Sequence, residues 1–85
     1  MVISRGSVLG KTVSSNENIR LTGWLKEKRL EKGYTMRSFA QVLGAPHTFV
    51  GKIENCERRL DVVEFVKYCK ALEVDPKDGI DALGD

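Results

Sequence analysis

The side chains best suited to chemistry gather in one short stretch of this sequence. His47, Thr48 and Lys52 carry hydrogen-bonding groups close together, and Arg58 and Arg59 follow a few residues later. A hydroxyl donates and accepts, an imidazole does either according to its tautomer, and ammonium and guanidinium groups only donate. Such a group of donors and cations is typical of a surface that binds a polar or anionic partner.

The reactive residue types do not form a catalytic or metal-binding constellation. His47, Cys56 and Cys69 have neither the spacing of metal ligands nor a nucleophile paired with a base on a common face. The sequence has no glycine-rich phosphate loop, and 85 residues leave little room for an enzyme cleft. We therefore expect a binding protein without a metal, a cofactor or enzymatic activity.

The charges are distributed unevenly along the chain. The net charge of +2 divides into +1 for residues 1–19, +5 for residues 20–59 and −4 for residues 60–85. The positive middle segment contains the polar residues named above, and this asymmetry indicates a polyanionic partner on one side of the molecule. Chance clustering of solvated charges is the alternative that the charge pattern alone leaves open.

Two short amphipathic helices joined by a glycine turn position the polar stretch. Thr35 is suited to cap the first helix, and Gly44 closes it because glycine adopts a left-handed conformation freely. The second helix is predicted over residues 46–54, with Val50 and Ile53 on its buried side. This pattern is the outline of a helix-turn-helix, buried on one face and free to bind on the other.

Three further helices complete the predicted fold. One spans residues 19–32 and ends at Gly33, another begins after the N-cap Asp61, and the last covers residues 77–83 after a proline. Apolar residues recur at helical spacing, without strand-like alternation in this part of the chain. The sequence predicts an all-α architecture of five short helices.

Residues 1–18 are predicted to form a flexible N-terminal arm, and residues 19–85 the helix-turn-helix domain. The arm is rich in serine, glycine and asparagine, and one short strand is the alternative for it. No apolar run approaches the roughly 18 residues that span a membrane. Neither a signal-peptide pattern nor a disulfide framework is present. We expect a cytoplasmic protein with reduced thiols and no membrane association.

Several short motifs follow one another between Leu21 and Leu83. In order, they include Leu25, Arg29, Gly33-Tyr34-Thr35, Phe39-Ala40, Leu43-Gly44, Val50, Ile53-Glu54, Ala71-Leu72 and Val74-Asp75-Pro76. This set resembles the phage-repressor-like (Cro and lambda repressor, XRE-type) helix-turn-helix family, and residues 49–65 are similar to its small, stand-alone bacterial regulators. The resemblance implies a five-helix lambda-repressor-like DNA-binding domain with the helix-turn-helix at its second and third helices.

The resemblance also implies which side chains contact DNA bases. In this family the second helix of the motif lies in the major groove. The matching positions here are His47, Thr48 and Lys52, with Phe49 beside them. Lys52 can donate to guanine, Thr48 can bond to several base edges, and Phe49 can pack on a thymine methyl group. The alternative for Phe49 is that its ring folds back onto its own domain.

Phosphate contacts are expected on both sides of that helix. Thr35 and Arg37 lie at the start of the preceding helix, where backbone amides and the helix dipole favour an anion. Asn55, Arg58 and Arg59 lie in the loop that follows. Such contacts position a protein on DNA without reading the base sequence. For the two loop arginines, a solvated charged turn is the alternative.

Two residues depart from the family pattern, and two others are expected to pair. Met36 stands where many members have a glutamine that binds a phosphate. Cys56 stands where members usually have a left-handed glycine, a conformation that costs other residues roughly 1 kcal/mol, unless Asn55 adopts it instead. The resemblance further implies a structural ion pair between Arg29 and Glu54.

The functional expectation is a sequence-specific transcriptional regulator, a repressor, that binds a palindromic double-stranded DNA operator as a homodimer. Four apolar residues are candidates for the subunit contact, with packing inside the monomer as the alternative: Val63, Tyr68, Ile80 and Leu83. The alternative function is an antitoxin or adaptor whose main role is to bind a partner protein such as a toxin.

Overall fold

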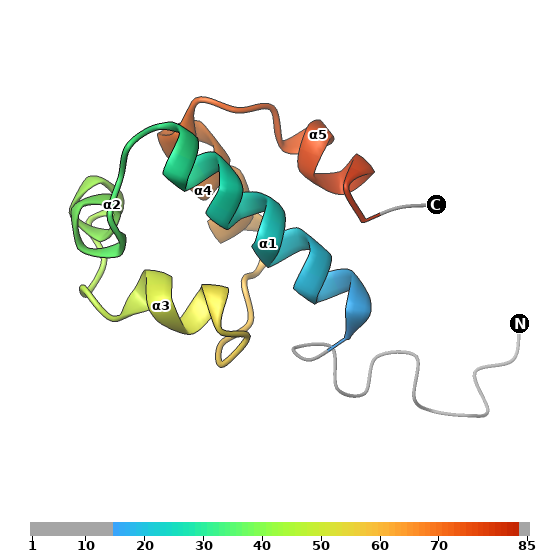
Figure 1. The fold of residues 1–85 in the computed structure, drawn as a ribbon, viewed down its shortest axis with the longest axis horizontal. Helices are drawn as coiled ribbons and strands as arrows, with labels where there is room; N and C mark the ends of the chain where they lie inside the picture. The colour runs from blue at the N-terminus through green and yellow to red at the C-terminus, as the bar shows by residue number, and fades with distance from the viewer. Residues whose placement is uncertain (1–14, 84–85) are drawn as a thin grey trace, which may run out of the picture.

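The computed structural model describes residues 15–83, which are entirely helical apart from their loops (Figure 1). The described helices are α1 (Asn16–Glu31), α2 (Met36–Leu43), α3 (Phe49–Glu54), α4 (Val62–Leu72) and α5 (Pro76–Asp81). The predicted all-α class and the five helices are confirmed. Most of the predicted arm, residues 1–14, lies outside the described residues.

Three helix boundaries differ from the predicted ones. α1 begins at Asn16 instead of residue 19, because Ser15 caps it by accepting a hydrogen bond from the Asn18 amide at 3.1 Å. α3 begins at Phe49 instead of residue 46, because the Phe49 amide donates to the Pro46 carbonyl at 2.9 Å and closes a turn. α5 begins with its proline and ends at residue 81.

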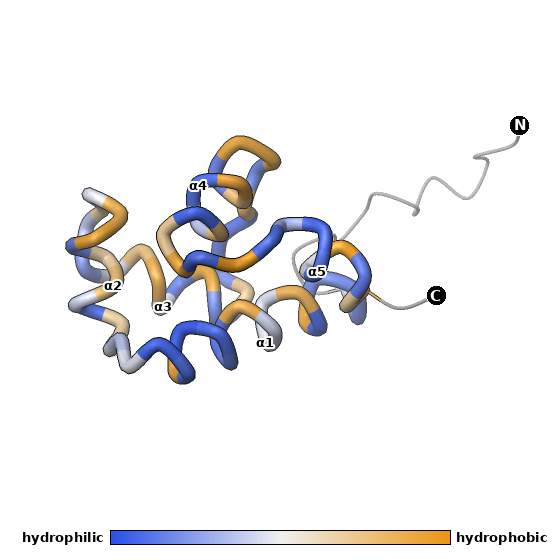
Figure 2. The backbone as a smooth tube through the Cα atoms, turned by 90° about the horizontal axis from the view of Figure 1, so that it is seen from above, coloured by the Kyte–Doolittle hydropathy of each residue, from blue (hydrophilic) through white to orange (hydrophobic). Residues whose placement is uncertain are grey.

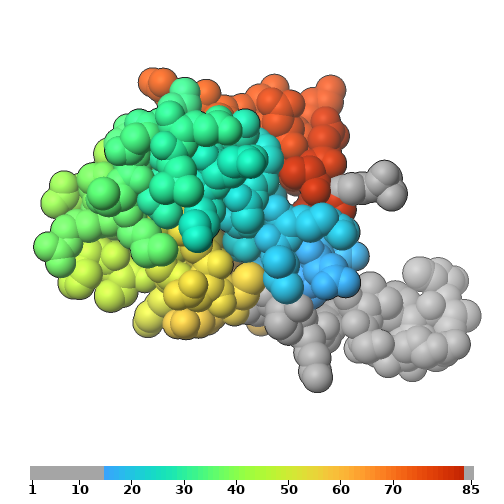
Figure 3. All heavy atoms as spheres, in the orientation of Figure 1, coloured from blue at the N-terminus to red at the C-terminus, as the bar shows by residue number. Residues whose placement is uncertain are grey.

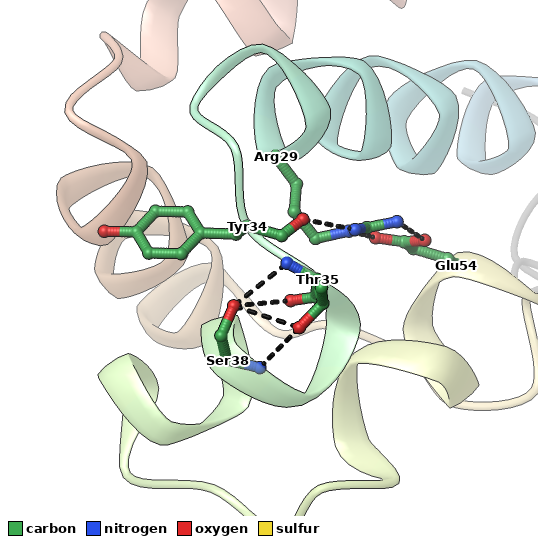
Figure 4. Close-up of polar contacts among 5 residues, drawn as sticks. All are labelled: Arg29, Tyr34, Thr35, Ser38 and Glu54. Atoms are coloured by element: carbon green, nitrogen blue, oxygen red, sulfur yellow. Dashed lines mark hydrogen bonds and ion pairs between the residues drawn. The ribbon is translucent and has the colours of Figure 1, made fainter.

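Side-chain caps fix where α2 and α4 begin. The Thr35 amide donates to Ser38 Oγ and the Ser38 amide donates to Thr35 Oγ1, both at 2.9 Å (Figure 4). Asp61 and Glu64 make the same reciprocal arrangement at the start of α4. Each arrangement satisfies two amides that the helix backbone leaves without a partner. The N-caps predicted at Thr35 and Asp61 are confirmed.

The core lies where α1, α2, α3 and α4 meet. Its buried apolar side chains are Leu25, Phe39, Ala40, Val50, Ile53, Phe65, Tyr68, Cys69 and Leu72. The rings of Phe39 and Tyr68 pack edge to face with their centroids 4.9 Å apart, a favourable geometry for aromatic pairs. Figure 2 shows polar and apolar residues alternating around the helices, as amphipathic helices around a shared core require.

Tyr68 belongs to this core, and its prediction as a subunit contact was wrong. Its side chain is 1% exposed and its ring packs between Phe39 and Phe49. α4 turns a wider apolar face inward than helical spacing alone indicated. Burial raises the pKa of Tyr68, and it raises the pKa of Cys69 to about 11, so both groups remain neutral at physiological pH.

α1 organises the arrangement of the other helices. It packs against α3, α4 and α5, whereas α2 packs against α3 and α4. The helix-turn-helix therefore lies at one end of α1 and α5 lies toward the other (Figure 1). α3 thus lies apart from α5.

Candidate nucleic-acid interface

The turn between α2 and α3 is built around one left-handed glycine. Gly44 has a φ of 71°, a conformation that residues with a side chain disfavour. The Gly44 amide donates to the Gln41 carbonyl at 3.1 Å, and the Ala45 amide donates to the Ala40 carbonyl at 2.9 Å. These bonds end α2 and redirect the chain into α3. The predicted glycine turn is confirmed.

α3 is anchored through one face and exposed on the other. Val50 and Ile53 are fully buried in the core, whereas Thr48, Lys52 and Asn55 are exposed. Residues three or four apart lie on the same side of a helix, so the three exposed residues form one row. In Figure 3 the atoms of this segment, coloured yellow-green to yellow, lie open to solvent along one edge of the molecule.

The four predicted base-contacting residues do not share one environment. Thr48 and Lys52 lie in the exposed row, and exposed His47 belongs to the turn that precedes α3. Phe49 is half-buried and its ring centroid lies 6.4 Å from that of Tyr68. The ring therefore folds back onto its own domain, which is the alternative that the sequence left open.

The start of α2 lies beside the middle of α3. The Met36 side chain lies close to Gly51 of α3. A Cβ placed on Gly51 would lie 3.5 Å from Met36 Sδ, which is ordinary van der Waals contact. Thr35 and Arg37, the predicted phosphate-binding residues of this helix, are both exposed next to Met36. Arg37 is the basic side chain that this edge presents to solvent.

Arg58, a predicted phosphate contact, pairs with a carboxylate, although 40% of its side chain is exposed. Its Nη1 and Nη2 atoms donate to Oε1 and Oε2 of Glu64, both at 2.9 Å, and its guanidinium lies 4.8 Å from the centroid of the Phe49 ring. Hydrogen bonds from Arg58 and from the Asp61 amide hold the pKa of Glu64 below its ordinary value. Glu64 was not among the predicted residues, although its position three residues after the N-cap Asp61 is the signal of a capping box.

The exposed charge of the helix-turn-helix has one sign. Between residues 35 and 55 the ionised side chains are Arg37, Lys52 and Glu54. Arg37 and Lys52 are exposed, whereas the Glu54 side chain is 2% exposed and pairs with Arg29. The following loop exposes one charge of each sign, Glu57 and Arg59, so the excess of exposed positive charge lies on the helix-turn-helix itself. A surface of this kind attracts a phosphate backbone.

Arg29 and Glu54 form the ion pair expected from the sequence (Figure 4). Arg29 Nε donates to Glu54 Oε2 at 2.6 Å and Nη2 donates to Oε1 at 3.0 Å, while Nη1 donates to the Tyr34 carbonyl at 2.7 Å. The pair is buried, with 5% of the Arg29 side chain exposed. It joins α1, the loop before α2 and the end of α3.

Cys56 adopts the left-handed conformation that its position requires. Its φ is 59°, whereas Asn55 has a φ of −89°. The Glu57 amide donates to the Lys52 carbonyl at 2.8 Å and ends α3. The Cys56 sulfur lies 3.6 Å from the hydroxyl of Thr22 in α1. The backbone cost therefore falls on Cys56, and Asn55 stays exposed beside α3.

The other candidate subunit contacts lie at the start of α4, in α5 and just after α5. Val63 is 61% exposed and Ile80 53% exposed, and Leu83 is half-buried. The Leu83 carbonyl accepts a hydrogen bond from Arg20 Nε at 3.1 Å. Val62, which the sequence analysis did not select, is 78% exposed next to Val63. Apolar side chains are thus available to a second molecule.

Two other kinds of site were sought within residues 15–83. No group of three or more histidine, cysteine, aspartate or glutamate residues in that range is arranged to hold a metal ion. None of the helices described is both long and apolar enough to cross a lipid bilayer.

Comparison with known proteins agrees with the geometry. Residues 25–78 match the helix-turn-helix family. A structure of an XRE-family like protein from Pseudomonas syringae pv. tomato has 39% sequence identity and a TM-score of 0.77, with 88% of this chain and 92% of that chain covered. No curated protein matches this sequence.

Restriction-modification controller proteins also share the fold. The controller C.AhdI from Aeromonas hydrophila has 25% sequence identity and a TM-score of 0.71, with 76% of this chain and 98% of that chain covered. A mutant of a second controller has 29% identity and a TM-score of 0.73, with 81% of this chain and 87% of that chain covered. This chain belongs to the XRE-type helix-turn-helix family of DNA-binding transcription regulators.

Proposed function

We propose that this protein is a sequence-specific repressor that binds a palindromic double-stranded DNA operator as a homodimer in the cytoplasm. The observation that carries the proposal is the sign of the exposed charge on the helix-turn-helix. Arg37 and Lys52 reach solvent, while the carboxylate of Glu54 is buried against Arg29. A duplex presents phosphates on both sides of its major groove, so a helix flanked by cations is suited to enter it.

Base recognition falls to the exposed row of α3 and to the turn before it. Lys52 can donate to guanine O6 and N7, and Thr48 can bond to several base edges. His47 is exposed at the start of the same surface, where its imidazole can donate or accept. Phe49 is held against Tyr68, so its part is to set the position of α3.

Phosphate contacts surround the base-reading residues. Thr35 and Arg37 lie at the start of α2, and Asn55 and Arg59 lie after α3; all four are exposed. Backbone amides at the start of a helix favour an anion. Contacts on both sides of α3 would fix its orientation in the groove without reading sequence.

A dimer would double the length of DNA that is read. One recognition helix covers only a few base pairs, and two-fold related half-sites lie about 34 Å apart along the DNA. Val62 and Val63 on α4, Ile80 on α5 and Leu83 just after it provide apolar surface for this contact. An occupied operator excludes other proteins from the same DNA, which gives repression.

A selection of genomic DNA fragments tests the proposal. Fragments bound by the full chain at a fixed salt concentration are sequenced, and the mass of the complex on the selected DNA is measured by light scattering. We expect one enriched palindromic motif and two protein chains per site. Fragments without a common motif would contradict sequence specificity, and one chain per site would contradict the dimer.

A further inference from the structure

The loop after α3 contains two arginines. Arg58 forms an ion pair with Glu64, whereas Arg59 forms none within the described residues. Arg58 Nη1 and Nη2 each donate to a separate oxygen of Glu64 at 2.9 Å, and Nη1 also donates to the Arg59 carbonyl at 2.8 Å. The guanidinium lies over the Phe49 ring at 4.8 Å. Carboxylate, carbonyl and ring together fix the plane and the direction of the Arg58 side chain.

The other cations near the binding face are not held in this way. Within residues 15–83, Arg37, Lys52 and Arg59 take part in no ion pair. Of the four exposed or half-buried bases from residue 35 to residue 59, Arg58 alone has its charge matched by a carboxylate. Arg58 is thus a neutralised cation at the edge of a surface whose other cations, Arg37, Lys52 and Arg59, are not neutralised by a carboxylate.

The Arg58–Glu64 pair is accessible to solvent. The Arg58 and Glu64 side chains are 40% and 30% exposed, unlike the Arg29–Glu54 pair, whose side chains are 5% and 2% exposed. Solvent reaches both partners, so an arginine released from Glu64 regains water or finds another anion. In a DNA complex the nearest abundant anions are phosphates.

Glu64 also connects this charge to the position of α3. Its Oε1 accepts a hydrogen bond from the Asp61 amide at 3.1 Å, which fixes the carboxylate at the start of α4. Phe49, under the Arg58 guanidinium, is the first residue of α3. The chain of contacts therefore runs from the start of α4 through Arg58 to the start of the recognition helix.

We infer that Glu64 is a specificity-determining residue that acts through Arg58, holding its guanidinium on the Phe49 ring and away from the DNA phosphates. The inference rests on the proposed DNA-binding function. Phosphate contacts strengthen binding to every DNA sequence alike. A cation withheld from the phosphates lowers binding to unrelated DNA, while the fixed Phe49 ring preserves the base contacts of α3. The withheld cation lowers affinity for operator and unrelated DNA alike, so the ratio of specific to non-specific affinity rises through the fixed position of α3.

The Glu64→Gln variant removes the negative charge of residue 64 while keeping its shape and its place in the helix cap. Glutamine has nearly the same shape as glutamate and still accepts the bond from the Asp61 amide, as capping boxes allow, but it no longer neutralises Arg58. Binding of the full chain to an unrelated duplex and to the selected operator is measured over a series of salt concentrations. For the unrelated duplex we expect the slope of log K against log salt to steepen by about 0.9 for each bound subunit, the value for one added phosphate contact. The ratio of operator to non-specific affinity falls.

Two variants control for effects of charge alone. Glu57→Gln removes an exposed carboxylate from the same loop, and it should leave the slope at the wild-type value because Glu57 forms no ion pair within the described residues. Adding Arg58→Gln to Glu64→Gln should restore the wild-type slope, because no released guanidinium is left.

The outcomes distinguish this inference from the proposed function. A wild-type protein that binds no duplex DNA overturns both. A wild-type protein that binds its operator, with Glu64→Gln leaving both the slope and the specificity ratio unchanged, overturns only the role of Glu64. A steeper slope that persists in the double variant, or that Glu57→Gln reproduces, overturns the part assigned to Arg58.

Discussion

Arg29 in α1 and Glu54 at the end of α3 are joined by a bond of 2.6 Å between Nε and Oε2. The remaining guanidinium nitrogen, Nη1, donates to the Tyr34 carbonyl. One arginine thus fixes the end of α3 against two other parts of the chain. It also removes the single carboxylate of the helix-turn-helix from the surface that would meet DNA.

Removing one partner of this pair is expected to destabilise the fold strongly. Arg29→Met leaves the Glu54 carboxylate buried without a partner, which costs about 3–5 kcal/mol of unfolding free energy. Chemical denaturation with urea measures the loss. Arg29→Met combined with Glu54→Leu should recover much of it, because an apolar pair leaves no buried charge. A single variant with wild-type stability would show that the pair does not hold α3.

Replacing the left-handed residue after α3, Cys56, with glycine is expected to stabilise the fold. Cys56 has a φ of 59°, and glycine at that position avoids a conformational cost of about 1 kcal/mol. We expect Cys56→Gly to raise the unfolding free energy by up to that amount in urea titrations. Cys56→Ala is the control, since alanine keeps the strain and loses the sulfur contact to Thr22. Equal stability of the two variants would argue against strain at this residue.

The parts of the fold that could be predicted from the sequence are those set by neighbouring residues, such as the helix ends. Thr35, Gly44 and Asp61 mark helix ends through their own backbone and side-chain chemistry, and the structure places helix ends at all three. The start of α3 was missed because a proline in a first turn and a proline before a helix look alike. Hydrogen bonding from Phe49 to Pro46 decides between them.

The side-chain environments depended on contacts between distant segments. Tyr68 looked like a surface residue until α2 and α3 brought the Phe39 and Phe49 rings against it. Arg58 was predicted to contact phosphate without its carboxylate partner, because only the packing of α4 places Glu64 opposite it. Neither partner is visible from helical spacing, because each depends on how α4 packs behind the helix-turn-helix.

Two glycines that look alike in the sequence should differ in their tolerance of a side chain. A Cβ on Gly79 would lie 2.8 Å from Trp24 Cζ3 and 2.9 Å from Phe65 Cζ, so Gly79→Ala should cost about 1–3 kcal/mol through overpacking. The matched control is Gly23, a solvent-exposed residue in the middle of α1, where an added Cβ would have no neighbour within 4 Å. Gly23→Ala should stabilise by about 0.5–1 kcal/mol. Thermal melts with shifts of the same sign would contradict the α1–α5 packing.

The Arg58–Glu64 pair predicts a dependence of stability on pH. Arg58 holds the pKa of Glu64 below its ordinary value of 4.5, so the ionised pair stabilises the folded state at every pH above that value. The contribution is lost as the pH falls from 4.5 through the lower folded pKa. Urea titrations should show wild type more stable than Glu64→Gln at neutral pH, with a difference that shrinks in acid. A difference that stays constant in acid would mean that Glu64 stabilises without its charge.

The proposal that the exposed row of α3 reads DNA is tested most directly by comparing Lys52→Ala with Lys67→Ala, an exposed lysine of α4. The measurement is fluorescence anisotropy of the selected operator and of an unrelated duplex at one salt concentration. We expect Lys52→Ala to weaken operator binding by about 1–3 kcal/mol with little change on the unrelated duplex, and Lys67→Ala to leave operator binding close to wild type. Equal losses for Lys52→Ala on both DNAs, or a larger loss for Lys67→Ala, would contradict a recognition helix at α3.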